Sequence, residues 1–163
     1  MSSLVFLIFP ALMIVAAICD VRSFLIPNRV TAAIAAAWPF AVLLAGMGMM
    51  DAMWSVLLAA GVLVFCFGLF AFGWLGGGDA KLLAVTTLWI GPAVLPAFLF
   101  VTVMAGAGLA IVLLTFRRFP LPVMAATVGW VSQLHERKRD IPYGVAIAAG
   151  AIYTWPATAF FPF

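Results

Sequence analysis

Charged residues are scarce in this sequence. Only 8% of its 163 residues are Asp, Glu, Lys or Arg, whereas 67% are hydrophobic, and the mean hydropathy is +1.28. A chain with so few polar side chains cannot cover a water-facing surface, which excludes a soluble globular domain. The composition therefore indicates a protein that crosses the lipid bilayer several times, with an all-α fold made of transmembrane helices.

Cysteine is also rare, and a strong positive charge is missing. Cys19 and Cys66 lie in apolar stretches without CxxC spacing, which argues against a zinc module and against a disulfide framework. The net charge of +3 is too small, and the Lys and Arg residues lie too close to apolar runs, to indicate a nucleic-acid partner. No metal or other cofactor is predicted, and the sequence indicates no particular oligomeric state.

The start of the chain lacks the features of a cleavable signal peptide. Met1-Ser2-Ser3 carries no basic residue, and the apolar run that follows leads to Asp20 rather than to a small-residue cleavage site. We interpret this run as a retained first helix. Asp51 marks the predicted turn between the second and third of six transmembrane helices. The six predicted spans are residues 4–19, 30–50, 52–75, 80–91, 93–116 and 141–162.

The longest uncharged run, residues 82–116, must contain a break. As one helix it would be about 50 Å long at roughly 1.5 Å per residue, against a hydrocarbon core of roughly 30 Å. Gly91-Pro92 and Pro96 lie within this run. Because proline lacks the N–H that a continuing helix needs, these residues predict that the chain folds back there.

The basic residues provide a test of this number of spans. With six spans, all of them fall on one side of the membrane, and Asp51 is the only charge on the other side. The basic side is therefore predicted to be cytoplasmic, with both termini on the non-cytoplasmic side. Residues 119–135 have cationic flanks at both ends, and Met124, Val128 and Val131 follow helical spacing, so this segment is predicted to lie in the membrane interface. The eight basic residues are Arg22, Arg29, Lys81, Arg117, Arg118, Arg137, Lys138 and Arg139.

This topology places Asp20 and Asp79 at the same cytoplasmic face. A carboxyl at this depth costs roughly 2.5–3.5 kcal/mol on insertion scales, so its presence there indicates a function. Two such charges within about 4 Å would repel by roughly 4 kcal/mol, and one carboxyl would keep its proton. The ionised member could then take a proton from water while the neutral member donates to a scissile carbonyl, as in an aspartic protease. For Asp20 alone, a helix-end charge that helps to set the topology is the alternative.

The run Gly76-Gly77-Gly78 removes every Cβ just before Asp79. An extended substrate segment could lie against this strip of backbone, and a flexible turn between helices is the alternative interpretation. Arg22 and Lys81 each lie two positions from one of the aspartates. They are candidates for tuning the carboxyls or meeting the substrate, and otherwise they serve as topology anchors.

Three short motifs follow one another along the chain. They are Asp20 with Pro27-Asn28 after it, Gly76-Gly77-Gly78-Asp79, and Ile141-Pro142-Tyr143-Gly144. Together they resemble the first Asp motif, the GxGD motif and the IPYG run of the prepilin peptidases, the intramembrane aspartyl proteases that mature type IV pilins. The resemblance implies that the two aspartates carry catalysis without a metal. It also implies that the residues near them shape the site or bind substrate, namely Arg22, Pro27, Asn28, Gly76, Gly77, Gly78, Lys81, Pro142, Tyr143 and Gly144.

The chain is shorter than many members of the family that it resembles. Longer bacterial members carry a cytosolic insert with paired CxxC motifs and methylate the new pilin N-terminus, and this chain has no such insert. The short form is similar to the prepilin peptidases of tight-adherence (Flp) pilus systems. The resemblance therefore implies a multi-pass enzyme of the bacterial inner membrane without methyltransferase activity. Its expected partner is a prepilin precursor, contacted through the leader peptide and the first apolar helix.

Two other functions remain open on the sequence alone. The first is an intramembrane aspartyl protease that acts on another precursor. The second is a small proton- or cation-coupled transporter subunit in which Asp20 and Asp79 relay protons. The chain shows no evident inverted repeat, which disfavours the transporter.

Overall fold

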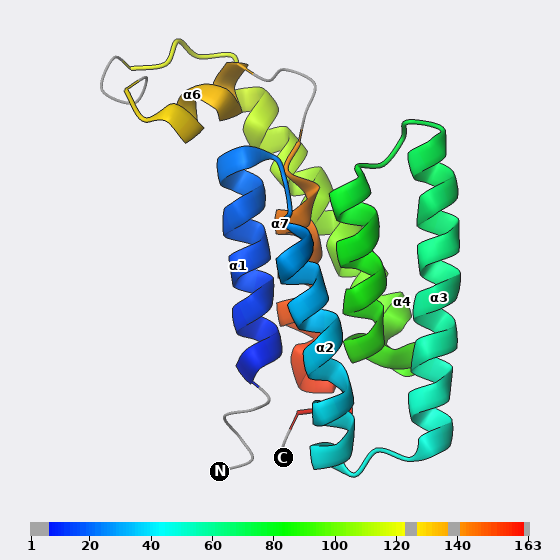
Figure 1. The fold of residues 1–163 in the computed structure, drawn as a ribbon. Helices are drawn as coiled ribbons and strands as arrows, with labels where there is room; N and C mark the ends of the chain where they lie inside the picture. Colours follow the sequence, from blue (N-terminus) through cyan, green and yellow to red (C-terminus); the bar gives the residue numbers. More distant parts are fainter. Residues whose placement is uncertain (1–6, 123–126, 137–140, 162–163) are drawn as a thin grey trace.

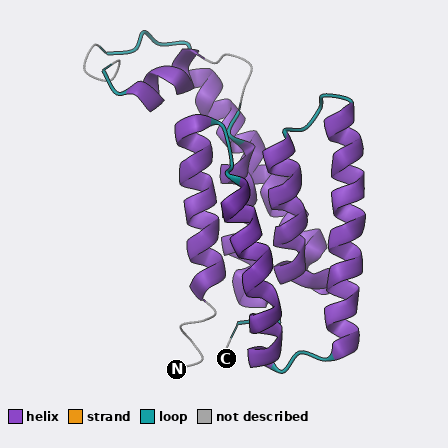
Figure 2. Ribbon diagram, in the orientation of Figure 1, coloured by secondary structure: helices purple, strands orange, loops and turns teal. Residues whose placement is uncertain are grey.

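The structure is a computed structural model that describes residues 7–122, 127–136 and 141–161. Over this part of the chain the regular structure is helical and contains no strand (Figure 2). The long helices pack side by side as a bundle, and a short helix lies across one end (Figure 1). The elements are α1 (Ile8–Ser23), α2 (Asn28–Ala45), α3 (Met49–Ala71), α4 (Gly77–Phe116), α6 (Gly129–Glu136), α7 (Tyr143–Thr154) and the 3₁₀ helix η2 (Trp155–Ala157).

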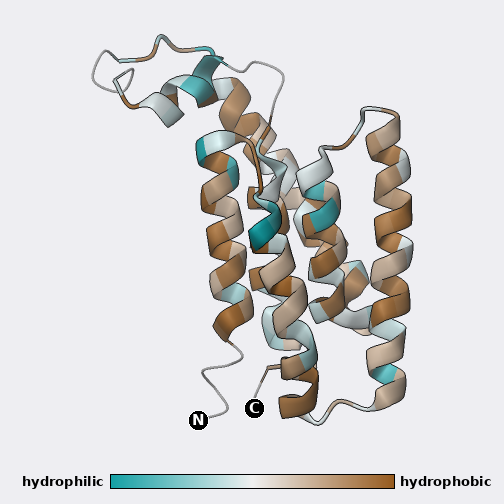
Figure 3. Cartoon of the chain, viewed as in Figure 1, coloured by the Kyte–Doolittle hydropathy of each residue, from teal (hydrophilic) through white to brown (hydrophobic). Residues whose placement is uncertain are grey.

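Three of the described helices are long and apolar enough to cross a membrane, namely α2, α3 and α4. Most of their residues are hydrophobic, as the mostly brown α3 in Figure 3 shows. Helices α1 and α7 are shorter, with 16 and 12 residues. The prediction of an all-helical membrane protein is confirmed at this level.

Helix α4 contains the predicted break. Gly91 has φ 72° and ψ 169°, a conformation that glycine adopts without strain, and Pro92 follows it. The two arms of α4, residues 77–90 and 92–116, run in opposite directions in Figure 1. The chain therefore reverses within what would otherwise be one overlong helix.

The turn between α2 and α3 differs from its predicted position. Helix α2 ends at Ala45 because Gly46 adopts a left-handed conformation with φ 63°, and its N–H donates to the Leu43 carbonyl. Helix α3 then begins at Met49, so Asp51 lies in its first turn rather than in the loop. An acidic side chain is favourable there because the helix dipole is positive at that end.

The C-terminal third also differs from the predicted spans. Helix α6 covers only the end of the predicted interfacial segment 119–135, and Met124 lies outside the described residues. None of the α6 residues is buried. Helix α7 ends at Thr154, well before the predicted end of the last span, because Trp155 and Pro156 continue as a 3₁₀ turn.

An aromatic cluster holds the bundle together at the end where α1 begins. Phe9 stacks on Trp89 with ring centroids 4.9 Å apart and lies 4.9 Å from Trp155. The Trp89 indole N–H also donates to the Ile34 carbonyl at 3.0 Å, which ties α4 to α2. Buried aromatic side chains of this size contribute strongly to packing, so this cluster holds α1 and α4 against η2, which directly follows α7.

Candidate active site

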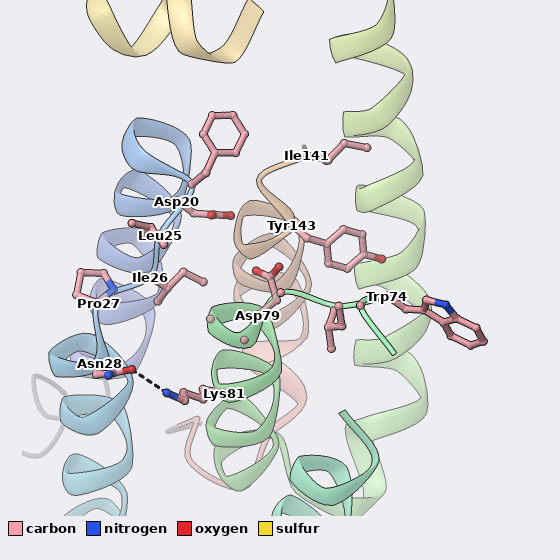
Figure 4. Close-up of a pocket in the computed structure, with 16 residues that line it drawn as sticks. Asp20, Leu25, Ile26, Pro27, Asn28, Trp74, Asp79, Lys81, Ile141 and Tyr143 are labelled. Atoms are coloured by element: carbon pink, nitrogen blue, oxygen red, sulfur yellow. Dashed lines mark hydrogen bonds between the residues drawn. The ribbon is translucent and has the colours of Figure 1, made fainter. Parts of the chain in front are cut away.

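Asp20 and Asp79 line the same cavity, which has a volume of about 1150 Å³. Asp20 lies in the last turns of α1, and Asp79 lies in the first turn of α4. These two helix ends meet at the same end of the bundle, and both carboxyls point into the space between the helices (Figure 4). The two groups interact electrostatically. Asp20 is only 4% exposed, whereas Asp79 is half-buried.

The connection from α1 to α2 forms one wall of the cavity. Phe24 adopts a left-handed conformation with φ 55°, and its N–H donates to the Asp20 carbonyl at 2.8 Å, which ends α1 sharply. The chain then passes through Leu25 and Ile26 to Pro27, which is the N-cap of α2. Proline suits this position because the first helical N–H groups have no partner within the helix.

The glycine run forms the opposite wall and begins α4. Gly76 is the N-cap in an extended conformation, and a Cβ placed on it would lie 2.9 Å from Oδ2 of Asp79. A Cβ on Gly78 would lie 3.4 Å from the Cβ of Ile26. The absence of side chains therefore lets α4 approach the α1–α2 connection and gives the Asp79 carboxyl its place.

A hydrogen bond joins these two walls. The Lys81 ammonium donates to the Asn28 side-chain oxygen at 3.0 Å (Figure 4). Both side chains line the cavity. This bond links the first turn of α2 to the second turn of α4, so it couples the segments that follow each aspartate.

The beginning of α7 closes the cavity from a third direction. The Gly144 N–H donates to Oδ2 of Asp20 at 2.7 Å. Pro142 is the N-cap of α7, and Tyr143 lines the cavity beside Asp79 (Figure 4). The Tyr143 ring lies against Gly106 of the second α4 arm, where an added Cβ would come within 2.6 Å of the ring.

The cavity lining contains most of the site residues predicted from the sequence, but not Arg22, Pro142 or Gly144. Pro142 and Gly144 lie beside it at the start of α7. Arg22 lines a separate apolar groove between α1 and α7, together with Trp130 of α6. Residues two positions apart on a helix do not share a face, so Arg22 points away from the Asp20 carboxyl. The predicted residues in the cavity lining are Asp20, Pro27, Asn28, Gly76, Gly77, Gly78, Asp79, Lys81 and Tyr143.

Several residues at the cavity were not predicted. Ile26 lies between the starts of α4 and α7, since it meets both Gly78 and Gly144. Its place between Asp20 and Pro27-Asn28 is a signal that could have drawn attention to it. Gly106 had no such signal, because only the fold brings it against Tyr143. The other unpredicted lining residues are Phe24, Leu25, Gly73, Trp74, Leu75 and Ile141.

Residues 7–111 match the type IV leader peptidase family, a range that contains both aspartates and extends into the second arm of α4. The chain belongs to the type IV leader peptidase family. The resemblance to prepilin peptidases is thereby confirmed. Comparisons with curated proteins and with solved structures gave no match.

Family membership makes this chain a membrane protein with peptidase activity toward type IV leader sequences. The matched range ends before α7, so the contact between Gly144 and Asp20 comes from the structure alone. Within the described residues of this leader peptidase, no group of three or more His, Cys, Asp or Glu side chains could hold a metal ion. Paired carboxyl groups are sufficient for acid–base hydrolysis of a peptide bond.

Proposed function

We propose that this leader peptidase is an aspartic endopeptidase in which Asp20 and Asp79 act together on water and the scissile carbonyl. The observation that carries the proposal is that the two carboxyls line one cavity, although they lie far apart in the sequence. Carboxyls in a bundle with so few charges are costly to keep, which supports a chemical role. General acid–base catalysis by such groups contributes typically about 10²- to 10⁴-fold to a rate.

The substrate that we propose is a type IV prepilin of the tight-adherence (Flp) kind. Its leader would reach the cavity at the cytoplasmic boundary, and its first apolar helix would remain in the bilayer. The glycine strip and the residues of the α1–α2 connection, including Pro27 and Asn28, would hold the peptide. The absence of a long insert between the predicted spans supports a peptidase without methyltransferase activity.

The proposed topology has six transmembrane helices, with α1, α2, α3, the two arms of α4 and α7 as the spans. The cavity and the basic residues would face the cytoplasm, and both termini would lie outside, in the inner membrane of a bacterium. The positions of Arg22 and Lys81 near the cavity end of the bundle support this orientation.

The test is leader removal from a co-expressed Flp-type prepilin, followed on a gel by the appearance of the smaller pilin. Asp20→Asn and Asp79→Asn should each reduce cleavage by at least about 10²-fold, because an amide can neither accept nor donate the required proton. Both variants should remain inserted and abundant in the membrane fraction. Cleavage retained by either variant would refute the paired-carboxyl mechanism.

A control precursor that should not be cleaved tests the substrate specificity of the enzyme separately from its catalytic mechanism. A precursor with an ordinary secretory signal peptide should stay uncut in the same cells. Mass spectrometry of the mature pilin should find an unmethylated N-terminus. Cleavage of the secretory precursor at a comparable rate would argue against a dedicated prepilin peptidase.

A further inference from the structure

The first turn of α7 lies against the Asp20 carboxyl. The Gly144 N–H donates to Oδ2 of Asp20 at 2.7 Å, whereas the next N–H, that of Val145, donates to the Pro142 carbonyl at 3.2 Å. Gly144 lies in the first turn of α7, where the leading N–H groups lack an i−4 partner, so its N–H is available to the Asp20 carboxyl. Hydrogen bonds donated to a carboxylate favour its ionised form.

This contact depends on the missing side chain of Gly144. A Cβ placed there would lie 2.8 Å from Oδ2 of Asp20 and 2.9 Å from Cδ1 of Ile26, so both groups would have to move. Tyr143, the residue before Gly144, is held in place as well, because its ring packs against Gly106. The start of α7 is therefore a fixed support for Asp20 rather than an adjustable one.

Asp79 has different surroundings. Within the described part of the chain, its carboxyl receives no hydrogen bond, although it lies in the first turn of α4. The dipole of its own helix favours a negative charge, but α7 adds a direct N–H donor only at Asp20, from Gly144. The ionisable groups that face Asp20 across the cavity are Asp79, Lys81 and Tyr143, whereas Arg22 on its own helix faces the separate groove.

We infer that the first turn of α7 holds Asp20 as the carboxylate of the pair, so that Asp20 is the general base and Asp79 the general acid. This inference rests on the proposed Asp-pair function and assigns Gly144 as a positioning residue. The Asp20 carboxylate removes a proton from water while the water oxygen bonds to the scissile carbonyl carbon. At the same time Asp79 gives its proton to the carbonyl oxygen, which produces a gem-diol.

The second half of the reaction restores both groups. The gem-diol returns one hydroxyl proton to Asp79 as the new carboxyl forms. The C–N bond breaks, and the leaving nitrogen takes the proton that Asp20 removed from water. Asp20 ends as a carboxylate and Asp79 as an acid, which is the arrangement that the hydrogen bond from Gly144 favours at the start.

Carbon-13 NMR of the full-length enzyme tests the assignment directly. The chain has only four aspartates, so a sample labelled at the Asp carboxyl carbons in lipid nanodiscs gives few signals. Asp20→Asn and Asp79→Asn identify the two signals of interest. At neutral pH we expect the Asp20 carbon at the carboxylate position and the Asp79 carbon at the carboxylic acid position. The reverse order, two carboxylates or one averaged signal would overturn the assignment.

A second measurement tests the part played by Gly144. In Gly144→Ala the acid limb of the pH–rate profile for leader cleavage should move upward by about one pH unit, the size expected when one charge-assisted hydrogen bond is lost. Gly108→Ala is the matched control, because no atom lies within 4 Å of a Cβ at that position. Its profile should keep the wild-type shape. A slower Gly144→Ala enzyme with an unmoved acid limb would overturn the positioning role.

The two proposals can fail separately. If both Asn variants lose cleavage but the wild-type spectrum shows the reverse protonation, only the assignment of base and acid fails. If either Asn variant still cleaves, the Asp-pair function itself fails. The wild-type spectrum needs no change at position 144, so it decides the assignment even if Gly144→Ala does not fold.

Discussion

Two helix starts in this molecule have nearly the same local structure but different surroundings. Helix α3 begins after Gly48 and has Asp51 three residues later, and α4 begins after Gly76 and has Asp79 three residues later. Both glycines are extended N-caps, with φ/ψ of −61°/144° and −68°/140°. In each case the N-cap carbonyl accepts a hydrogen bond of 3.0 Å from the residue after the aspartate. A glycine-capped helix with an early aspartate is therefore not enough to make a site.

The difference lies in what each helix start meets. Asp51 is exposed at the opposite end of the bundle, and it is the only charged residue lining its cavity. Asp79 shares a cavity with Asp20 and Lys81. The second residue of α4 is Gly78, which packs on Ile26, whereas the second residue of α3 is the exposed Met50. The chemistry of the α4 start thus depends on partners from other helices.

Lengthening each aspartate by one methylene should produce the largest difference between these two helix starts. Asp79→Glu moves the carboxyl by about 1 Å or more, and a misplacement of that size can cost roughly 10²-fold in rate. Asp51→Glu should leave cleavage within about twofold of the wild type. The measurement is the initial rate of leader removal in proteoliposomes. Equal losses of cleavage rate in both variants would show that the α3 and α4 starts do not differ in function.

The general character of this fold could be predicted from the sequence, because it follows from composition and from a few strong local signals. The reversal in α4 was predictable from Gly91-Pro92, since proline cannot continue the helix and glycine tolerates the required backbone angles. The end of α2 at Gly46 was not predicted, because residues 30–50 contain no charge that would mark the end of a span.

The candidate site, like the fold, could be predicted from the sequence only in part. The pairing of Asp20 with Asp79 could be predicted from the sequence, because the positive-inside rule places both at one membrane face. The run Gly76-Gly77-Gly78, directly before Asp79, was a second signal. The contact between Gly106 and Tyr143 was beyond sequence reasoning, because it joins two helices at a depth that no local pattern specifies. Long-range packing of this kind is fixed by the whole bundle rather than by neighbouring residues.

A smaller but more specific effect is expected from the two N-cap glycines. A Cβ at Gly76 would lie 2.9 Å from Oδ2 of Asp79, whereas a Cβ at Gly48 would lie 3.3 Å from Oδ2 of Asp51. Gly76→Ala should therefore push the Asp79 carboxyl aside and lower the cleavage rate on the order of tenfold. The amount of folded enzyme should hardly change, since the atom that must move is the end of a flexible side chain. Gly48→Ala should leave the rate unchanged, and a comparable loss there would point to a general helix-capping effect.

The smallest expected effect concerns the residue two positions after each aspartate. Lys81 in α4 donates to Asn28, whereas the corresponding residue in α3 is Met53, which is partly exposed. Lys81→Met removes this bond between α4 and α2, and a net loss of about 1 kcal/mol corresponds to roughly fivefold in the cleavage rate. Asn28→Ala should cause a similar loss, and the double variant should lose little more, because both changes remove the same interaction. Fully additive losses in this double-mutant cycle would show that the two side chains act independently, and that the α4 start differs from the α3 start for reasons other than this bond.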